Sequence, residues 1–119
     1  MNHVILVRRS AGGFYQAEFI KDAGRVRVRC NCSAGSIGQI CRHKRALIAG
    51  KTRILHDAGQ ARLLEEILAW PEMQALAERA AEYESDLEAI EHKKQELDKE
   101  EQLIWRRYSS DCLDGIHEL

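Results

Sequence analysis

The N-terminal quarter of the chain alternates apolar and polar residues in three short runs. The runs cover residues 3–9, 14–20 and 25–30; Gly12-Gly13 separates the first two, and a turn ending at Gly24 separates the last two. Alternation over such lengths, bounded by glycine, is typical of antiparallel strands joined by hairpins. The pattern therefore predicts a three-stranded antiparallel meander.

The third run has two chemically different faces. Side chains alternate across a strand, so Val26 and Val28 share one face with Cys30. The opposite face carries the arginine row, which consists of Arg25, Arg27 and Arg29. Charged side chains are costly to bury in an apolar core. We therefore expect the arginine row to face solvent or a negatively charged ligand.

Helical periodicity replaces alternation further along the chain. Residues 33–40 are predicted to form a glycine-bearing loop, and residues 41–49 a short helix that ends at Gly50. A second helix is predicted from about residue 58, and Trp70-Pro71 should end or kink it, because proline suits the first position of a following helix. No glycine or proline occurs between Glu72 and Tyr108. A continuous helix there would be about 55 Å long.

The last helix carries apolar residues at alternating steps of three and four. We call the following eight positions the heptad stripe: Tyr83, Leu87, Ile90, Lys94, Leu97, Glu101, Ile104 and Tyr108. Such spacing is typical of a coiled coil. A packing face within the chain is the alternative, but the length of the helix favours pairing with a second chain, so we expect a homodimer. Lys94 and Glu101 would weaken a parallel pair and could pair with each other in an antiparallel one.

Charge divides the chain into two regions. Residues 1–56 contain eleven Lys and Arg against two acidic residues, a net charge of +9, whereas residues 57–119 contain seven against seventeen, a net charge of −10. We therefore predict a basic module at 1–56 and an acidic helical region at 57–119. Such asymmetry indicates a nucleic-acid or other anionic partner for the basic region; two solvated faces of opposite sign are the alternative.

Four metal-ligating residues lie within fourteen positions, and they predict one structural zinc site. Cys30 and Cys32 form one pair, and Cys41 and His43 form a second pair at the start of the predicted short helix. Thiolate and imidazole are the ligands that tetrahedral Zn²⁺ prefers, and four of them leave no open position for catalysis. Asn31, between the first two cysteines, tolerates the unusual backbone dihedrals that a turn there would need.

The compartment expected from the sequence agrees with a metal site. The longest apolar run near the start, Val4–Val7, is too short for a signal peptide or a membrane span. We therefore expect a cytoplasmic protein with no membrane partner. In that reducing compartment closely spaced cysteines are metal ligands more often than disulfides.

The order Cys-x-Cys, loop, Cys-x-His resembles the SWIM-type zinc finger over about residues 14–50. The strand Val26–Arg29 before the first cysteine and Ala46 in the helix after His43 support this likeness. The resemblance implies zinc ligation by the two pairs of residues named above. SWIM fingers occur in transposases, chromatin ATPases, plant transcription regulators and recombination accessory proteins. The family is associated with DNA binding and with protein–protein contact.

Taken together, these patterns predict an α+β protein that binds nucleic acid, most simply DNA, through a basic face. The expected phosphate contacts are Arg25, Arg27, Arg29, Arg42, Lys44 and Arg45. The alternative is an adaptor, regulator or inhibitor that docks on an acidic protein surface. An enzyme is the least expected class, because the sequence contains no HExxH motif, nucleophile elbow or phosphate-cradling loop.

Overall fold

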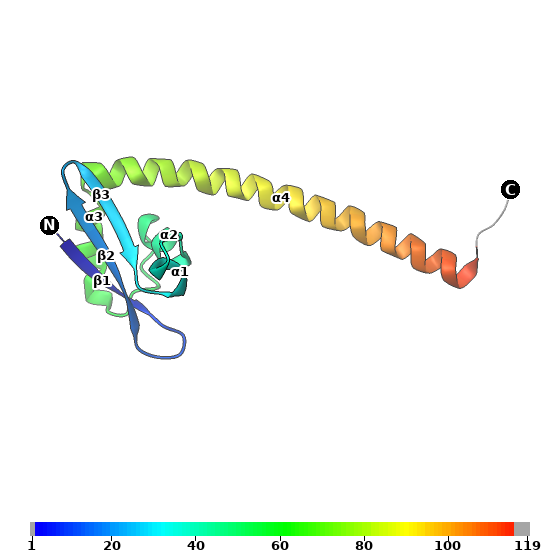
Figure 1. Ribbon diagram of the computed structural model, residues 1–119, viewed down its shortest axis with the longest axis horizontal. Helices are drawn as coiled ribbons and strands as arrows, with labels where there is room; N and C mark the ends of the chain where they lie inside the picture. The colour runs from blue at the N-terminus through cyan, green and yellow to red at the C-terminus, as the bar shows by residue number, and fades with distance from the viewer. Residues whose placement is uncertain (1, 116–119) are drawn as a thin grey trace. The chain divides into compact units, whose positions relative to one another are not determined.

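The computed structural model describes residues 2–115 and confirms the predicted α+β architecture (Figure 1). Strands β1 (Asn2–Arg8), β2 (Phe14–Asp22) and β3 (Arg25–Cys30) form one antiparallel sheet in the order β1-β2-β3. Short hairpins connect neighbouring strands, as the alternating pattern and the glycines predicted. The sheet is therefore a meander in which β2 is central.

A two-residue turn at Ala23 and Gly24 joins β2 to β3. Both residues have positive φ, 49° and 75°, and Ala23 is the one residue other than glycine with positive φ in residues 2–115. Two successive left-handed residues match the right-handed twist of the flanking strands, which is why such turns are favoured in hairpins. The turn fixes the register that places Arg25 opposite Asp22.

The outer edge of β1 is covered by a segment about fifty residues away in sequence. The His56 backbone N–H donates to the Leu6 carbonyl at 2.9 Å. The Gln60 side chain accepts from the Leu6 N–H at 2.8 Å and donates to the Val4 carbonyl at 3.2 Å. Uncovered strand edges are sites of unwanted pairing. A single glutamine side chain thus satisfies backbone groups that a fourth strand would otherwise have to meet.

Helices follow the sheet in sequence. They are α1 (Ser33–Ser36), α2 (Arg42–Ile48), the 3₁₀ turn η1 (Ala58–Gln60), α3 (Ala61–Leu68) and α4 (Pro71–Asp114). α4 begins at the proline that was predicted to start it and runs without interruption for 44 residues. α1 lies in the segment predicted as a loop; it is only four residues long, and the side chain of Cys32 caps it.

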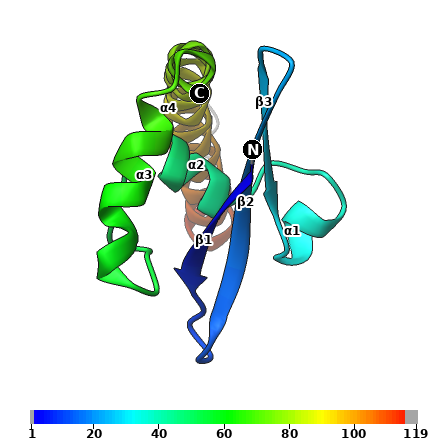
Figure 2. The same ribbon diagram turned by 90° about the vertical axis from the view of Figure 1, so that its left-hand side faces the viewer.

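One face of the sheet carries the hydrophobic core, and α2 and α3 lie on that same side (Figure 2). The buried core residues are Ile5, Val7, Ala17, Phe19, Leu47, Leu55, Leu64, Ile67 and Met73. They come from β1, β2, α2, the segment before η1, α3 and the first turn of α4. The sheet, α2, α3 and the start of α4 therefore share one core.

Packing divides the chain within α4. One compact unit extends to Glu82, and the second begins at Tyr83. The boundary drawn from charge, between residues 56 and 57, marks a change in composition; residues 58–82 belong by packing to the unit that contains the sheet. Residues 116–119 of the predicted acidic region lie outside the described residues. In the part described, no helix combines the length and the apolar character needed to cross a membrane.

Candidate metal centre and basic surface

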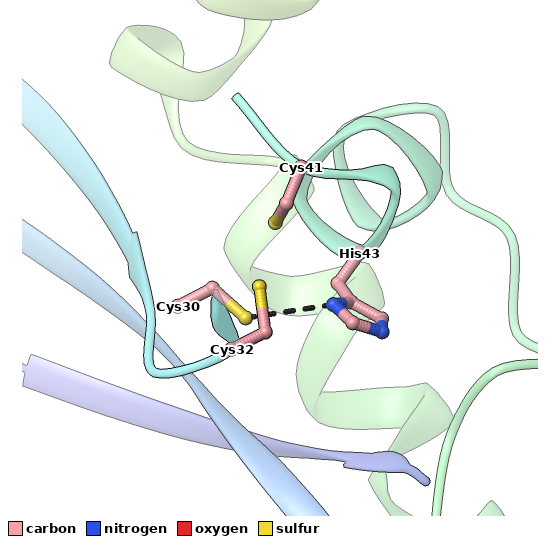
Figure 3. A group of neighbouring side chains, drawn as sticks. All are labelled: Cys30, Cys32, Cys41 and His43. Carbon is pink, nitrogen blue, oxygen red and sulfur yellow. Dashed lines mark hydrogen bonds between the residues drawn. The ribbon is translucent and has the colours of Figure 1, made fainter. Parts of the chain in front are cut away.

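The two pairs of metal-ligating residues come together in one buried cluster (Figure 3). The side chains of Cys30, Cys32, Cys41 and His43, which we call the metal cluster, place their ligand atoms within 4.8 Å of one another. Cys30 ends β3 and Cys32 follows it, while Cys41 precedes α2 and His43 lies in its first turn. The cluster therefore joins the end of the sheet to the start of a helix.

The geometry of the metal cluster fits a tetrahedral ion. Bonds of about 2.0–2.3 Å to sulfur and nitrogen place neighbouring ligands about 3.5–3.8 Å apart around such an ion. The distance from Cys30 Sγ to His43 Nδ1 is 3.7 Å. Nδ1 is the ring nitrogen that points toward the cysteine sulfurs (Figure 3). Three thiol groups and one imidazole thus offer four ligands at suitable separations, with Nδ1 as the histidine donor.

Asn31 holds the two N-terminal cysteines in place by hydrogen bonding and not by an unusual backbone conformation. The expected role in a strained turn is wrong, because Asn31 is not among the residues with positive φ. Its side-chain Oδ1 accepts from the Gln16 N–H at 2.8 Å, and its own N–H donates to the Gln16 carbonyl at 3.1 Å. This pairing with β2 continues one residue past Cys30 and fixes where the chain turns toward Cys32.

Backbone N–H groups point at two of the sulfur atoms. The Gly35 N–H donates to Cys32 Sγ at 3.3 Å, and the Lys44 N–H donates to Cys41 Sγ at 3.3 Å. Each cysteine is therefore the N-cap of a helix, α1 or α2. Hydrogen bonds and helix N-termini of this kind favour thiolate over thiol. At Cys32 this contact favours the thiolate, which is the form that binds a cation.

The ionisation of the metal cluster reflects burial and these hydrogen bonds. Desolvation, reinforced by the neighbouring sulfurs, raises the pKa of Cys30 to about 12. Burial also opposes ionisation of Cys32, but hydrogen bonds from the Gly35 N–H and the neighbouring thiols outweigh it and lower its pKa. Burial, together with the charge of Arg42, lowers the pKa of His43. His43 is thus neutral at neutral pH, which is the form that binds a metal.

Tyr15 is a component of the site that the sequence pattern did not single out. Its ring lies 5.2 Å from the His43 ring, and the Arg9 guanidinium lies 4.9 Å above the Tyr15 ring. His43 Nε2 is buried and has no hydrogen-bond partner within residues 2–115. Ring contact with Tyr15, together with the contact between Cys30 Sγ and Nδ1, therefore orients the imidazole. The position of Tyr15 on the inward face of β2, two residues before Ala17, is the signal that could have found it.

The arginine row lies on the outer face of β3, as predicted. Arg25, Arg27 and Arg29 are all exposed. The register of the sheet pairs Arg29 with Glu18 and Arg25 with Asp22 across the strands, while Arg27 lies opposite Ile20. Acidic residues of β2 thus lie opposite both ends of the row, whereas Arg27 lies opposite an apolar residue.

The basic residues of α2 do not all lie at the surface. Arg42 and Arg45 are exposed, but Lys44 is only 8% exposed, and its ammonium group donates to the Gln39 carbonyl at 3.1 Å. Lys44 is thus largely buried and bonded within the chain, and its place among the expected phosphate contacts stays a prediction. Five of the six predicted basic contacts are therefore exposed, on two elements that flank the metal cluster.

An open hollow of about 800 Å³ lies beside β3 and α1. Arg27 and Arg29 line it together with Gln16, Asn31 and Ser36, and Glu18 is its acidic member. Guanidinium, amide and hydroxyl groups are the usual partners of phosphate oxygens. The hollow thus adds neutral hydrogen-bonding groups to part of the arginine row.

No family model, curated protein or solved structure matches this chain. The likeness to the SWIM finger therefore rests on the spacing of the four ligands and on the elements that carry them. The structure places these ligands as the spacing requires: a strand leads into the first pair and a helix follows the second.

Proposed function

We propose that this chain is a zinc-stabilised module that binds nucleic acid, most simply DNA. The observation that carries the proposal is the buried metal cluster, which links β3 to α2 directly beside the exposed arginine row. The resemblance to SWIM fingers, a family associated with DNA binding, supports the same role. The proposed role is binding and not catalysis, in a reducing, cytoplasmic compartment where thiolates remain free for metal.

Zinc is the metal that suits this ligand set best. Three thiolates and one imidazole in a small, closed site match its preference for soft and borderline ligands in tetrahedral geometry. All four ligands are protein side chains, so the ion would crosslink the end of β3 to the start of α2 and supply folding energy. Without it, three sulfurs and a histidine would be buried together with little apolar contact around them.

Phosphate contacts would supply most of the affinity for nucleic acid. Each Lys or Arg that neutralises a phosphate releases a counterion, which makes the affinity depend strongly on salt. The exposed basic groups that flank the metal cluster are the arginine row with Arg42 and Arg45. α2 is only seven residues long, and no helix-turn-helix accompanies it within residues 2–115. We therefore propose binding through the backbone of the nucleic acid with little base readout.

A salt titration of duplex binding tests this proposal. Binding of the full-length protein to a fluorescent duplex is measured by anisotropy at several salt concentrations, for the wild type and for a variant in which the arginine row is changed to glutamine. The plot of log affinity against log salt should lose about three units of slope, because each removed phosphate contact contributes about one. Several unrelated duplexes should show the same loss.

The matched control removes the same charge elsewhere. Arg62→Gln, Arg79→Gln and Lys99→Gln change three exposed residues on α3 and α4. This variant should retain the wild-type slope. Affinity that hardly changes with salt in the wild type, or an equal loss in both variants, would contradict a nucleic-acid surface on β3.

A protein partner is the second candidate, and two exposed side chains favour it. Ile37 and Ile40, in the segment between the two ligand pairs, are 71% and 63% exposed. Apolar side chains at the centre of a polar rim are typical of protein interfaces. Under this alternative the basic residues would dock on an acidic protein. Ile37→Ser with Ile40→Ser would then abolish partner capture while leaving duplex binding unchanged.

Self-association of α4 completes the proposal. The apolar members of the heptad stripe are exposed along a single uninterrupted helix. We propose that this stripe pairs with a second copy of the chain to form a homodimer. Measurement of the mass in solution by light scattering tests this directly, and a monomer mass across the accessible concentration range would refute it.

A further inference from the structure

The heptad stripe presents an apolar surface along the second half of the chain. From Tyr83 to Tyr108 its six apolar side chains are between 48% and 64% exposed. They lie on one continuous helix that contains neither glycine nor proline after Pro71 and before Gly115. An exposed stripe of this length on a helix is stable in water when another helix covers it.

The stripe defines a heptad register for every residue beside it. The first core position, a, holds Leu87, Lys94, Glu101 and Tyr108, and the second, d, holds Tyr83, Ile90, Leu97 and Ile104. The flanking position g, before each a, holds Asp86, Lys93, Glu100 and Arg107. The flanking position e, after each d, holds Glu84, Glu91, Asp98 and Trp105. Residues at e and g lie at the rim of a coiled-coil interface and set the choice and direction of the partner.

A parallel dimer in register places like charges together at the centre. Each a residue then meets the same residue of the second copy, so Lys94 faces Lys94 and Glu101 faces Glu101. Parallel dimers also pair each g position with the next e position of the second copy, which gives one repulsive pair, Asp86 with Glu91, and one attractive pair, Lys93 with Asp98. Like charges held close in a partly dry interface are destabilising.

We infer that α4 pairs with a second copy in an antiparallel coiled coil centred between Lys94 and Leu97. In this arrangement a residues meet d residues, so Leu87 lies opposite Ile104 and Tyr83 opposite Tyr108 of the second copy. Lys94 lies opposite Leu97, one layer from Glu101 of the second copy. The two charges inside the seam thus become neighbours of opposite sign.

The g positions select this register over its alternatives. Antiparallel helices bring g against g, which here pairs Lys93 with Glu100 and Asp86 with Arg107, each twice by symmetry. If one helix slips by one heptad in one direction, Lys93 pairs with Arg107, and Glu100 pairs with Glu100 of the second copy. A slip of one heptad in the opposite direction pairs Lys93 with Lys93 of the second copy. The e positions contribute one unfavourable pair, Glu91 with Asp98, on either side. Four favourable g pairs therefore oppose two unfavourable e pairs.

This inference rests on the proposed self-association and is independent of nucleic-acid binding. It names the direction and register of the pair, which the exposed stripe alone leaves open. The experiment below separates failure of the register from failure of the pairing itself, because dimer mass and charge dependence are measured on the same samples.

Charge reversal at the g positions tests the register in the full-length protein. Glu100→Lys should weaken the dimer by about tenfold, because it replaces two attractive pairs by two repulsive ones. Lys93→Glu should weaken it similarly, and the double variant should restore wild-type affinity. The Glu100→Lys substitution should not weaken the dimer by destabilising the helix itself. The introduced lysine lies four residues after Glu96 and gains a favourable pair within its own helix. Dissociation constants are measured by sedimentation equilibrium.

Mixing provides the sharpest form of the test. The Lys93→Glu and Glu100→Lys variants should each associate weakly alone and form a mixed dimer of wild-type affinity, since every g pair is then favourable. Glu88→Lys, at an outward-facing b position, is the matched control and should leave the affinity unchanged. A parallel dimer would not show this pattern, because Glu100 would then face Trp105 and its reversal would have little effect.

Cys112 supplies a second, independent readout without any substitution. It is exposed and lies at an e position. In a parallel dimer the two Cys112 side chains lie at the same level and a short bismaleimide crosslinks them; in the antiparallel register they are about 50 Å apart along the helix axis. The expected result is no crosslinked dimer at concentrations where the protein is dimeric. Crosslinking in high yield would overturn the antiparallel register. A proven dimer whose affinity does not respond as expected to the Lys93 and Glu100 reversals would overturn it too. A monomer mass would overturn the pairing as well.

Discussion

Gly35 lies against the main chain of Cys30, in the first turn after the Cys-x-Cys pair. A Cβ atom at this position would meet the Cys30 carbonyl oxygen at 2.2 Å, a backbone contact that cannot yield. Gly35→Ala must therefore move α1 or the end of β3 and disturb the placement of Cys30 and Cys32. We expect a loss of about 1–3 kcal/mol in the free energy of unfolding, together with weaker zinc binding in a competition assay.

Gly59→Ala is the matched control for this substitution. Gly59 also lacks a positive φ, and its added Cβ would meet only the end of the Asp57 side chain, at 3.1 Å. The control should change neither stability nor zinc affinity by more than about 0.5 kcal/mol. Wild-type zinc affinity in Gly35→Ala would show that α1 does not position the metal cluster.

Proton release should accompany metal binding. Burial raises the pKa of Cys30 to about 12, so this thiol holds its proton at pH 7 in the metal-free protein. Zinc takes the thiolate and must displace that proton, and the affinity should therefore rise with pH. Calorimetry in buffers of different ionisation enthalpy at pH 7 should report at least one proton released per zinc. No dependence on the buffer would contradict the protonated state of Cys30.

The four metal ligands could be predicted from their spacing, because chemistry restricts which residues zinc accepts. Other components of the site could not. Lys44 is buried and its ammonium group donates to the Gln39 carbonyl. No local pattern in the sequence predicts that hydrogen bond. Tyr15 contacts His43 across a distance of 28 residues in sequence. The alternation of β2 places Tyr15 on the inward face, but its contact with His43 depends on the packing of separate elements.

At the scale of elements, α3 is bound into the same core as the sheet. Ile67 is fully buried, whereas Leu97 on α4 is 63% exposed. Ile67→Ala should destabilise the N-terminal unit by about 2–5 kcal/mol, as is usual for truncation of a buried aliphatic side chain. Leu97→Ala should leave the unfolding of that unit unchanged and weaken self-association. Chemical denaturation, followed by the fluorescence of Trp70 in a Trp105→Phe background, separates the two effects.

The opposite result would revise the division of the chain. If Ile67→Ala left the unfolding midpoint unchanged, α3 would not stabilise the sheet, and the change in charge near residue 56 would also be the structural boundary. If Leu97→Ala destabilised the N-terminal unit as strongly as Ile67→Ala, the stripe would be covered within the chain.

Most elements could be predicted because each has a local cause. Alternating side chains and glycine turns specify the strands, and Pro71 followed by a long stretch without glycine specifies α4. α1 could not be predicted from the sequence. Four residues carry no measurable period, and its cap is a cysteine, which is not a usual capping residue. The packing boundary at Glu82 could not be predicted from the sequence either, because Met73 and the heptad stripe belong to one continuous helix.

At the scale of the whole molecule, a basic unit that contains the metal cluster is followed by an acidic helical segment. The compact unit buries a core on one face of its sheet and leaves the arginine row on the other. Residues 83–115 of the second unit are all exposed and carry an apolar stripe. Binding chemistry and self-association are thus assigned to separate parts of the chain, and each proposal can fail without the other.

The central claim is that one zinc ion, held by the metal cluster, fastens β3 to α2. Elemental analysis of the purified protein tests it most directly, with Cys41→Ser and Cys112→Ser measured alongside. The account predicts one zinc per chain in the wild type and in Cys112→Ser, because Cys112 is exposed and lies outside the cluster. It predicts loss of the metal in Cys41→Ser. A wild-type protein that is folded without metal, or a Cys41→Ser variant that retains a full equivalent of zinc, would contradict it.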